Sequence, residues 1–350
     1  MNQQKRVLLN KIKRIKSFVT LNFLRLSAIV FFIIIFAYSC FSPPIFHSKI
    51  NDANNVDLKE NEFSLINYNI QSAFGKSDKK ISSLSNYFNK HKYDFVVMQE
   101  VFDEDVRTQL LQNFDTSFYK AKIPRVDYNN FPSNLNQDAG LFSISRFPLV
   151  DLSHINFGDD VKITNGGIHQ MLQKSFSISL DFLANKSILG SLHQINDSTN
   201  LFLFSTHLQA ISSRFHKTFQ LEQIYRFIVN AVYTVVKKGV VKSPNKLVVL
   251  LVGDLNYDAY SENDVNTLKS YLGNPRDLHK EYNNQLEEFT LFIKWIGLYR
   301  RVDYIFAYDN IGLIKLGKVK TKSINVSDIT DEENGSISDH LALKATLVIE

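Results

Sequence analysis

The chain has 350 residues, of which 44% are hydrophobic and 13% aromatic, so it is long and apolar enough to bury a sizeable core. Its formal net charge of +5 is concentrated at the N-terminus: seven of the 40 basic residues lie in residues 1–25, where no acidic residue occurs. The other 33 basic and 35 acidic residues nearly balance, which argues against a body that binds nucleic acid by charge alone. The single cysteine, Cys40, excludes an internal disulfide.

An uncharged, strongly apolar segment, Leu26–Phe41, follows the basic region. Together with residues 21–24 it is long enough to span a bilayer, and the basic flank predicts that the rest of the chain lies outside the cytoplasm. Three alternatives remain open: an uncleaved anchor, a cleaved signal peptide, and a lipoprotein signal, since Ala37–Cys40 resembles a lipobox. We expect a membrane-anchored or secreted protein, with a Pro-containing linker over 42–60 and one domain over 61–350.

Strand and helix patterns then alternate along the chain, which predicts an α/β fold in one domain. Helices are expected at 81–92 and at 213–236, the second capped by Ser212 or Ser213. Residues 120–139 and 151–173 show few packing signals and are predicted to be long surface loops. The expected strands cover residues 63–70, 93–98, 140–145, 200–206, 247–252, 302–307 and 341–348.

The stretch LVVLLVGDLNYDAYS, residues 247–261, combines an apolar predicted strand with polar residues at its end. Six apolar residues in a row predict a strand buried on both faces, and Gly253 allows the backbone to turn. Asp254 and Asn256 are two residues apart, so in an extended chain they point the same way. The pattern fits either two ligands aimed at one point or an ordinary Asp/Asn turn.

Polar side chains recur where the other predicted strands stop. Each has an ordinary structural explanation alone, such as a helix cap or a satisfied core histidine. Taken together they are two amides, four carboxylates and two histidines at the ends of apolar runs, where open α/β sheets bind ligands. The set is Asn69, Glu100, His207, Asp254, Asn256, Asp303, Asp339 and His340.

Hard oxygen ligands with few histidines favour Mg²⁺ over Zn²⁺, with Mn²⁺ or Co²⁺ as candidate substitutes. A histidine paired with a carboxylate can act as a general base toward an attacking water, and further donors can stabilise charge on phosphoryl oxygens. The residue set therefore predicts metal-dependent phosphoryl hydrolysis.

The order of these motifs resembles the endonuclease/exonuclease/phosphatase superfamily, over roughly residues 61 to 350. The resemblance implies a DNase I-like four-layer α/β sandwich, with two packed mixed β-sheets flanked by helices. It also implies that Glu100 is the main metal ligand, with Asn69 beside it and Asp339 supporting the metal side. The motifs that carry it are Asn69, Gln99-Glu100, Gly140-Leu141, Ser145-Arg146, Thr206-His207, Gly253 to Asn256, Asp303-Tyr304 and Ser338 to His340.

The same resemblance implies roles for the other polar residues. Asp254 and Asn256 would hold the nucleophilic water and the phosphate. His340 would be the general base, oriented by Asp303. His207 would stabilise the phosphoryl oxygens or assist the leaving group.

Within the superfamily, the stretches 140–149 and 205–210 resemble neutral sphingomyelinases, which implies hydrolysis of sphingomyelin to ceramide and phosphocholine. Arg146 and Lys174 would then contact substrate, although this chain has Lys174-Ser175 where the family pattern has Lys-Gly.

The aromatic run 289–299 is similar to a membrane-touching hairpin of bacterial relatives, with Trp295, Phe292 and Ile293 as the contacts; a core strand is the alternative. The competing functions are a nuclease of the same fold, disfavoured by the near-neutral body, and a non-enzymatic surface protein, disfavoured by the intact residue set.

Overall fold

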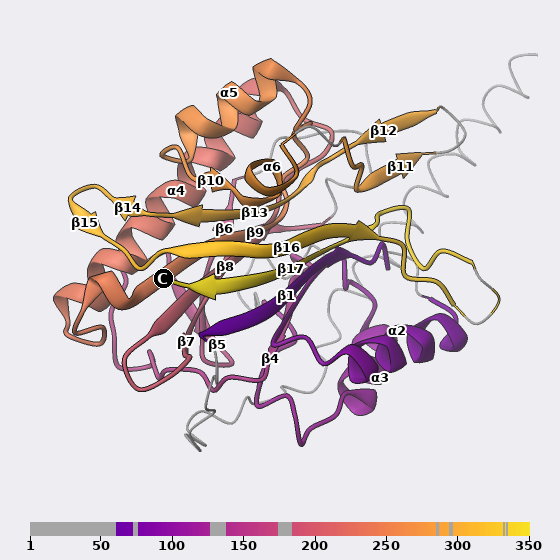
Figure 1. Cartoon of the computed structure of the whole chain (residues 1–350), viewed down its shortest axis with the longest axis horizontal. Helices are drawn as coiled ribbons and strands as arrows, with labels where there is room; N and C mark the ends of the chain where they lie inside the picture. Colours follow the sequence, from indigo (N-terminus) through magenta and orange to yellow (C-terminus); the bar gives the residue numbers. More distant parts are fainter. Residues whose placement is uncertain are drawn as a thin grey trace, which may run out of the picture. The chain divides into compact units, whose positions relative to one another are not determined.

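Two mixed β-sheets form the centre of the computed structural model (Figure 1). The structure describes residues 61–72, 76–126, 138–173, 184–284, 287–293, 297–331, 333 and 335–350. The predicted basic region, membrane-targeting segment and linker, residues 1–60, lie outside these ranges. Within the ranges, no helix has the length and apolarity needed to cross a bilayer.

The first sheet has the strand order β16-β17-β1-β2-β4-β3. β1 runs parallel to β2 and antiparallel to β17, so the sheet joins segments nearly 300 residues apart in the chain. Its strands are β1 (Glu62–Asn69), β2 (Phe95–Gln99), β3 (Ala121–Ile123), β4 (Phe142–Ser145), β16 (Val319–Ser327) and β17 (Ala342–Ile349).

The second sheet has the order β10-β13-β9-β8-β7-β6-β5, and β8 and β9 are its parallel pair. β9 lies between β8 and β13 and is buried on both faces, which explains the unbroken apolar run at 247–252. The strands are β5 (Lys162–Thr164), β6 (Gly167–Leu172), β7 (Lys186–Gln194), β8 (Asn200–His207), β9 (Leu247–Asp254), β10 (Arg276–Asp277) and β13 (Asp303–Tyr308).

The two sheets pack face to face through alternate residues of their central strands. Leu65 and Val97 of the first sheet share one buried cluster with Leu203, Leu250 and Ile305 of the second. Because successive side chains of a strand point to opposite faces, the intervening residues form separate clusters under the helices.

Helices cover the outer face of each sheet, which gives four layers (Figure 1). α2 (Asp78–His91) and α3 (Glu104–Asn113) pack on the first sheet. α4 (Arg214–Lys237) and α5 (Glu262–Tyr271) pack on the second. Ser213, one of the two predicted caps, begins α4 by accepting a hydrogen bond from the His216 amide. The predicted α/β four-layer sandwich is confirmed.

Shorter elements connect the layers. They are the 3₁₀ helix η3 (Pro244–Lys246), α6 (Leu278–Asn283), and two hairpins, β11 (Leu291–Ile293) with β12 (Leu298–Arg300) and β14 (Asn310–Ile311) with β15 (Ile314–Lys315).

Both segments predicted as long surface loops contain strands, so that prediction was wrong in part. β3 lies in the first segment, and β5 and β6 lie in the second. Ile168 and His169 in β6 are fully buried, although the strand has no continuous apolar run. Short strands with mixed sequence acquire their burial from neighbouring strands, which a local pattern does not reveal.

Candidate active site

Three polar residues lie side by side on adjacent strands of the second sheet. Asp254 at the end of β9 is in register with His207 of parallel β8 and with Asp303 of antiparallel β13. All three are almost completely buried. The strands therefore hold two carboxylates and an imidazole at one edge of the sheet, on rigid backbone.

Gly253 makes this arrangement possible at the strand end. Its φ is 148°, and a Cβ at this position would lie 2.0 Å from the carbonyl oxygen of Thr206 in β8. Any side chain would push β8 and β9 apart next to His207 and Asp254. The glycine before Asp254 therefore permits close backbone packing as well as a turn.

The first sheet brings two more residues to the same place. Asn69 ends β1, and Glu100 follows β2 with a left-handed φ of 55°. The Asn69 Nδ2 group donates to Glu100 Oε1 at 2.9 Å and to Asp254 Oδ2 at 3.0 Å. One amide thus connects the two sheets and holds two carboxylates close together.

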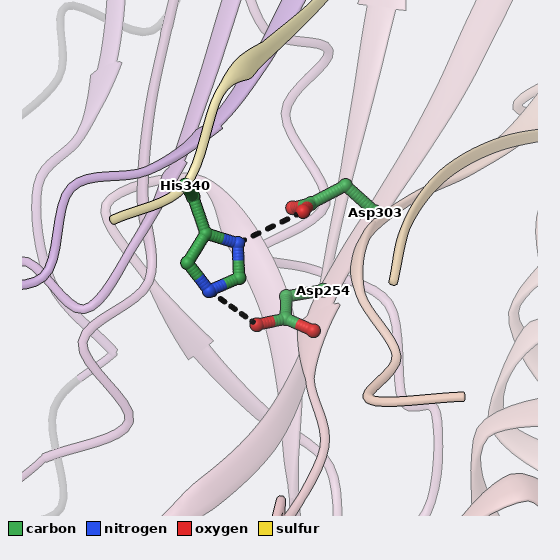
Figure 2. Close-up of side chains that lie close together, drawn as sticks. All are labelled: Asp254, Asp303 and His340. Atoms are coloured by element: carbon green, nitrogen blue, oxygen red, sulfur yellow. Dashed lines mark hydrogen bonds and ion pairs between the residues drawn. The ribbon is translucent and has the colours of Figure 1, made fainter. Parts of the chain in front are cut away.

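His340 lies between two carboxylates (Figure 2). Its Nδ1 lies 2.9 Å from Asp303 Oδ2, and its Nε2 lies 3.7 Å from Asp254 Oδ2. Since the carboxylate can only accept, Nδ1 carries a proton and donates it to Asp303. Nε2 faces Asp254 and is the nitrogen available for proton exchange with a substrate water.

Burial opposes the charged form of His340, but Asp303, its hydrogen bond and Asp254 together raise the His340 pKa from 6.5 to about 10. Burial and the neighbouring charge of Asp303 raise the pKa of Asp254 to about 7. Groups whose environments push their pKa values far from the ordinary range are typical of catalytic sites.

His207 lies near one carboxylate from each sheet. Its Nε2 lies 3.6 Å from Asp254 Oδ2 and 3.8 Å from Glu100 Oε1. Burial, with the charges of Lys186 and His340, holds the His207 pKa well below 6.5. The imidazole is therefore neutral and can offer one N–H to a phosphoryl oxygen.

The structure shows the Asp/Asn turn, and Asp254 also reaches the cluster, whereas the left-handed φ of 54° at Asn256 breaks the extended geometry that would aim both side chains alike. The Asn256 amide donates to Asp254 Oδ1 at 2.9 Å, which is an Asp turn, while Asp254 Oδ2 faces the histidines. The Asn256 side chain donates to Leu208 O at 3.0 Å, at the rim of the cluster. The Lys217 ammonium donates to Asn256 O at 2.9 Å.

The third predicted metal ligand, Asp339, joins the cluster through Gln71. The Gln71 side-chain Nε2 donates to Asp339 Oδ2, and the Gln71 backbone amide donates to Asn69 Oδ1, both at 3.0 Å. The Ser338 hydroxyl fixes the same loop by donating to Asn69 O at 2.8 Å. Glu100, Asn69 and Asp339 therefore lie within one network on the first-sheet side.

The donors on this side suit a hard divalent cation. They are carboxylate and amide oxygens, and Glu100 is partly exposed to solvent. Asp254, Asp303 and His340 form a second group whose ligand atoms lie within 4.8 Å of one another. Asp303 already uses both oxygens, on His340 and on the Asn67 amide. We therefore expect the cation beside Glu100, with the Asp303–His340 pair left intact.

The structure corrects the placement of Arg146. β4 is antiparallel to β2, so Arg146 lies beside Asp94, before β2, whereas Glu100 follows that strand. The Arg146 Nε lies 3.1 Å from Asp94 Oδ1. About 20 Å of strand separates it from the cluster, so it does not contact a substrate bound there.

Two other predicted contacts, Lys174 and Trp295, lie outside the described residues. Phe292 and Ile293 are in β11, half-buried, and pair with β12. The Phe292 ring packs on Tyr299 with centroids 4.6 Å apart. The predicted hairpin is therefore present, while its contact with a membrane stays a prediction.

Two buried side-chain amides that support Asp303 were not predicted from the sequence. Gln99 Nε2 donates to Asn67 Oδ1 at 2.8 Å, and Asn67 Nδ2 donates to Asp303 Oδ1 at 3.1 Å. The available signal was spacing: Asn67 precedes Asn69 by two residues and so lies on the same face of β1.

Several solved structures share this fold at low sequence identity. Sphingomyelinase C from Streptomyces griseocarneus is 15% identical, with 81% of this chain and 99% of that chain covered and a TM-score of 0.53. Beta toxin 275-280 from Staphylococcus aureus is 18% identical, with 81% and 99% covered and a TM-score of 0.52. D. rerio TDP2 complexed with a single-strand DNA product is 12% identical, with 82% and 98% covered and a TM-score of 0.53.

No family model and no curated protein matches the sequence. The three structures have the DNase I-like architecture, and the fold of this chain is that DNase I-like sandwich.

Proposed function

We propose that the protein is a Mg²⁺-dependent phosphodiesterase that hydrolyses sphingomyelin to ceramide and phosphocholine. The observation that carries the proposal is His340, bound to Asp303 through Nδ1 and open through Nε2 toward a cluster of carboxylates and amides. This geometry suits activation of a water next to a bound phosphodiester.

In the proposed reaction His340 acts in its neutral form, which a bound cation would favour by lowering the His340 pKa. Its Nε2 then takes a proton from a water whose oxygen attacks phosphorus. The new oxygen–phosphorus bond forms as the bond from phosphorus to the ceramide oxygen breaks. The ceramide oxygen takes a proton from solvent and His340 returns its proton to solvent, so that ceramide and phosphocholine leave. Asp303 fixes the tautomer and stabilises the imidazolium that forms. The His207 and Asn256 side chains are the proposed donors to the phosphoryl oxygens.

Glu100, Asn69 and Asp339 are the proposed cation ligands. A bound divalent cation would supply positive charge that polarises the phosphodiester and lowers the pKa values of nearby groups. A solved beta toxin variant of the same fold, 17% identical with a TM-score of 0.50, is described with bound magnesium ions, which supports the choice of metal. Mn²⁺ and Co²⁺ are the substitutes to test.

Two features favour a lipid substrate. The fold neighbours include a sphingomyelinase, and the motifs at 140–149 and 205–210 resemble that branch. A membrane-anchored or secreted location, with the catalytic domain outside the cytoplasm, follows from the proposed targeting segment at 26–41. The β11–β12 hairpin, with Trp295 in its connecting segment, would then touch the bilayer.

A nuclease is the second candidate, because one neighbour with this fold is described with a single-strand DNA product. A single assay separates the two: sphingomyelin vesicles and single-stranded DNA are offered in parallel, each with Mg²⁺ and with EDTA. Release of phosphocholine that EDTA abolishes would support the proposal. Cleavage of DNA alone would replace sphingomyelin with nucleic acid as the substrate.

A further inference from the structure

The proposed catalytic pair is divided between the two sheets. Asp303 begins β13 of the second sheet, whereas His340 lies two residues before β17 of the first. Their hydrogen bond of 2.9 Å therefore depends on how the two sheets are held relative to each other at this edge. A residue that binds both backbone segments would fix this distance.

Thr290 is such a residue, and it is fully buried at the base of the β11–β12 hairpin. On the Asp303 side, its hydroxyl oxygen accepts from the Val302 amide at 3.1 Å and from the Asp303 amide at 3.2 Å. The neighbouring strand β10 pairs with Phe306 and Ala307 of β13 and does not extend to Asp303, so it offers no carbonyl to the Asp303 amide. The Thr290 hydroxyl thus supplies the acceptor that a strand carbonyl would otherwise provide.

On the His340 side, Thr290 acts through its backbone. Its carbonyl accepts from the Leu341 amide at 2.7 Å, and two residues later the Phe292 amide donates to Asp339 O at 3.0 Å. Leu291 and His340 form the bridge between these two bonds. The segment that carries His340 is therefore paired with β11 on both sides of the histidine.

We propose that Thr290 is a positioning residue for the Asp303–His340 pair, holding the start of β13 through its hydroxyl and the His340 segment through its carbonyl. This inference rests on the proposed function. Loss of the hydroxyl leaves two buried amides without an acceptor, so the start of β13 shifts and the pair loses its geometry. Substrate contacts are untouched, so the loss falls on kcat and leaves KM unchanged.

The test compares Thr290→Val, which keeps the shape and removes the hydroxyl, with Thr290→Ser, which keeps the hydroxyl. Ser85→Ala is the matched control, because it removes a buried hydroxyl that donates to Ile81 O within α2. With Mg²⁺ and bis(p-nitrophenyl) phosphate, Thr290→Val should lower kcat at least about tenfold at constant KM. Thr290→Ser and Ser85→Ala should stay within about twofold of wild type.

A second readout does not need turnover. The His340 Nδ1 proton, hydrogen-bonded to Asp303, should give a downfield proton resonance, assigned by its loss in His340→Gln. The resonance should shift or broaden in Thr290→Val and persist in Thr290→Ser. An unchanged resonance in Thr290→Val, or an equal loss of kcat in Ser85→Ala, would overturn the proposal.

Failure of the proposed function would look different, because the wild-type protein would then show no metal-dependent turnover. The His340 resonance would still test the positioning role of Thr290 in that case. If Thr290→Val does not fold, amide hydrogen exchange of the wild-type protein tests the two contacts of Thr290. The Asp303 and Leu341 amides should both be protected, and free exchange of either would refute the positioning role of Thr290.

Discussion

The replacement Asp303→Asn tests the charge that supports His340. The two groups are fully buried and hydrogen-bonded at 2.9 Å, with their charge centres about 4 Å apart. At an effective dielectric constant of about 20, such a pair interacts by about 4 kcal/mol. That energy equals about three pKa units, and Asp303 acts in the direction that raises the His340 pKa.

Asparagine keeps the shape and can still accept from Nδ1, but it has no charge. In metal-free protein, the His340 pKa should therefore fall by about three units, as followed by NMR titration. The imidazolium that forms during water attack loses the same stabilisation, so kcat should fall about a thousandfold with Mg²⁺ present. KM should change little, because Asp303 does not face the substrate side.

Asp94→Asn is the matched control, because Asp94 is a buried carboxylate at the opposite end of β2, paired with Arg146. It should leave both the His340 pKa and kcat unchanged. If Asp303→Asn retained the wild-type kcat, or if His340 titrated in that variant as in wild type, Asp303 would not be the partner that sets the charge of this histidine.

Three further predictions concern the metal, the acid stability and the strand end. EDTA, or the replacement Glu100→Gln, should reduce turnover at least about a hundredfold. The thermal unfolding midpoint should change by no more than a few degrees. Full activity in EDTA would contradict a role for the metal. Burial lowers the His193 pKa from 6.5 to about 4. The folded state therefore binds this proton less readily than the unfolded state, and stability present above pH 6.5 falls between pH 6.5 and 4, by up to about 3 kcal/mol. Urea unfolding should show a smaller pH dependence in His193→Gln, and an unchanged dependence would exclude His193 as the source. Gly253→Ala would place Cβ against Thr206 O and should cost more than about 3 kcal/mol in urea unfolding, whereas Gly239→Ala, in open space, should cost less.

Sequence patterns were sufficient for the central strands and for α4. The runs at 201–204 and 247–252 are apolar because β8 and β9 are buried on both faces, so these strands can be recognised from the local sequence. The polar residues at strand ends were also readable, and the structure brings Asn69, Glu100 and His340 into one cluster.

What the sequence did not reveal depends on pairing between distant segments. The direction of β4 relative to β2 decides that Arg146 lies at the far end of the sheet, and no local pattern encodes that direction. Asn67 is hydrogen-bonded to Asp303, which is 236 residues away in the sequence. Thr290 is hydrogen-bonded to Leu341 because β11 runs beside the His340 segment. Such contacts become visible only when the sheet order is known.

The pairing of β1 with β17 has a consequence for the newly made chain. Asn69 and His340 are 271 positions apart, so a ribosome that has completed β1 must add most of the described domain before it reaches His340. At about 5 to 20 residues per second, that interval lasts roughly 15 to 55 seconds. During this time β17 is missing from its place beside β1, and the proposed site lacks His340. Under the proposed function, the chain would therefore lack activity until its synthesis is nearly complete.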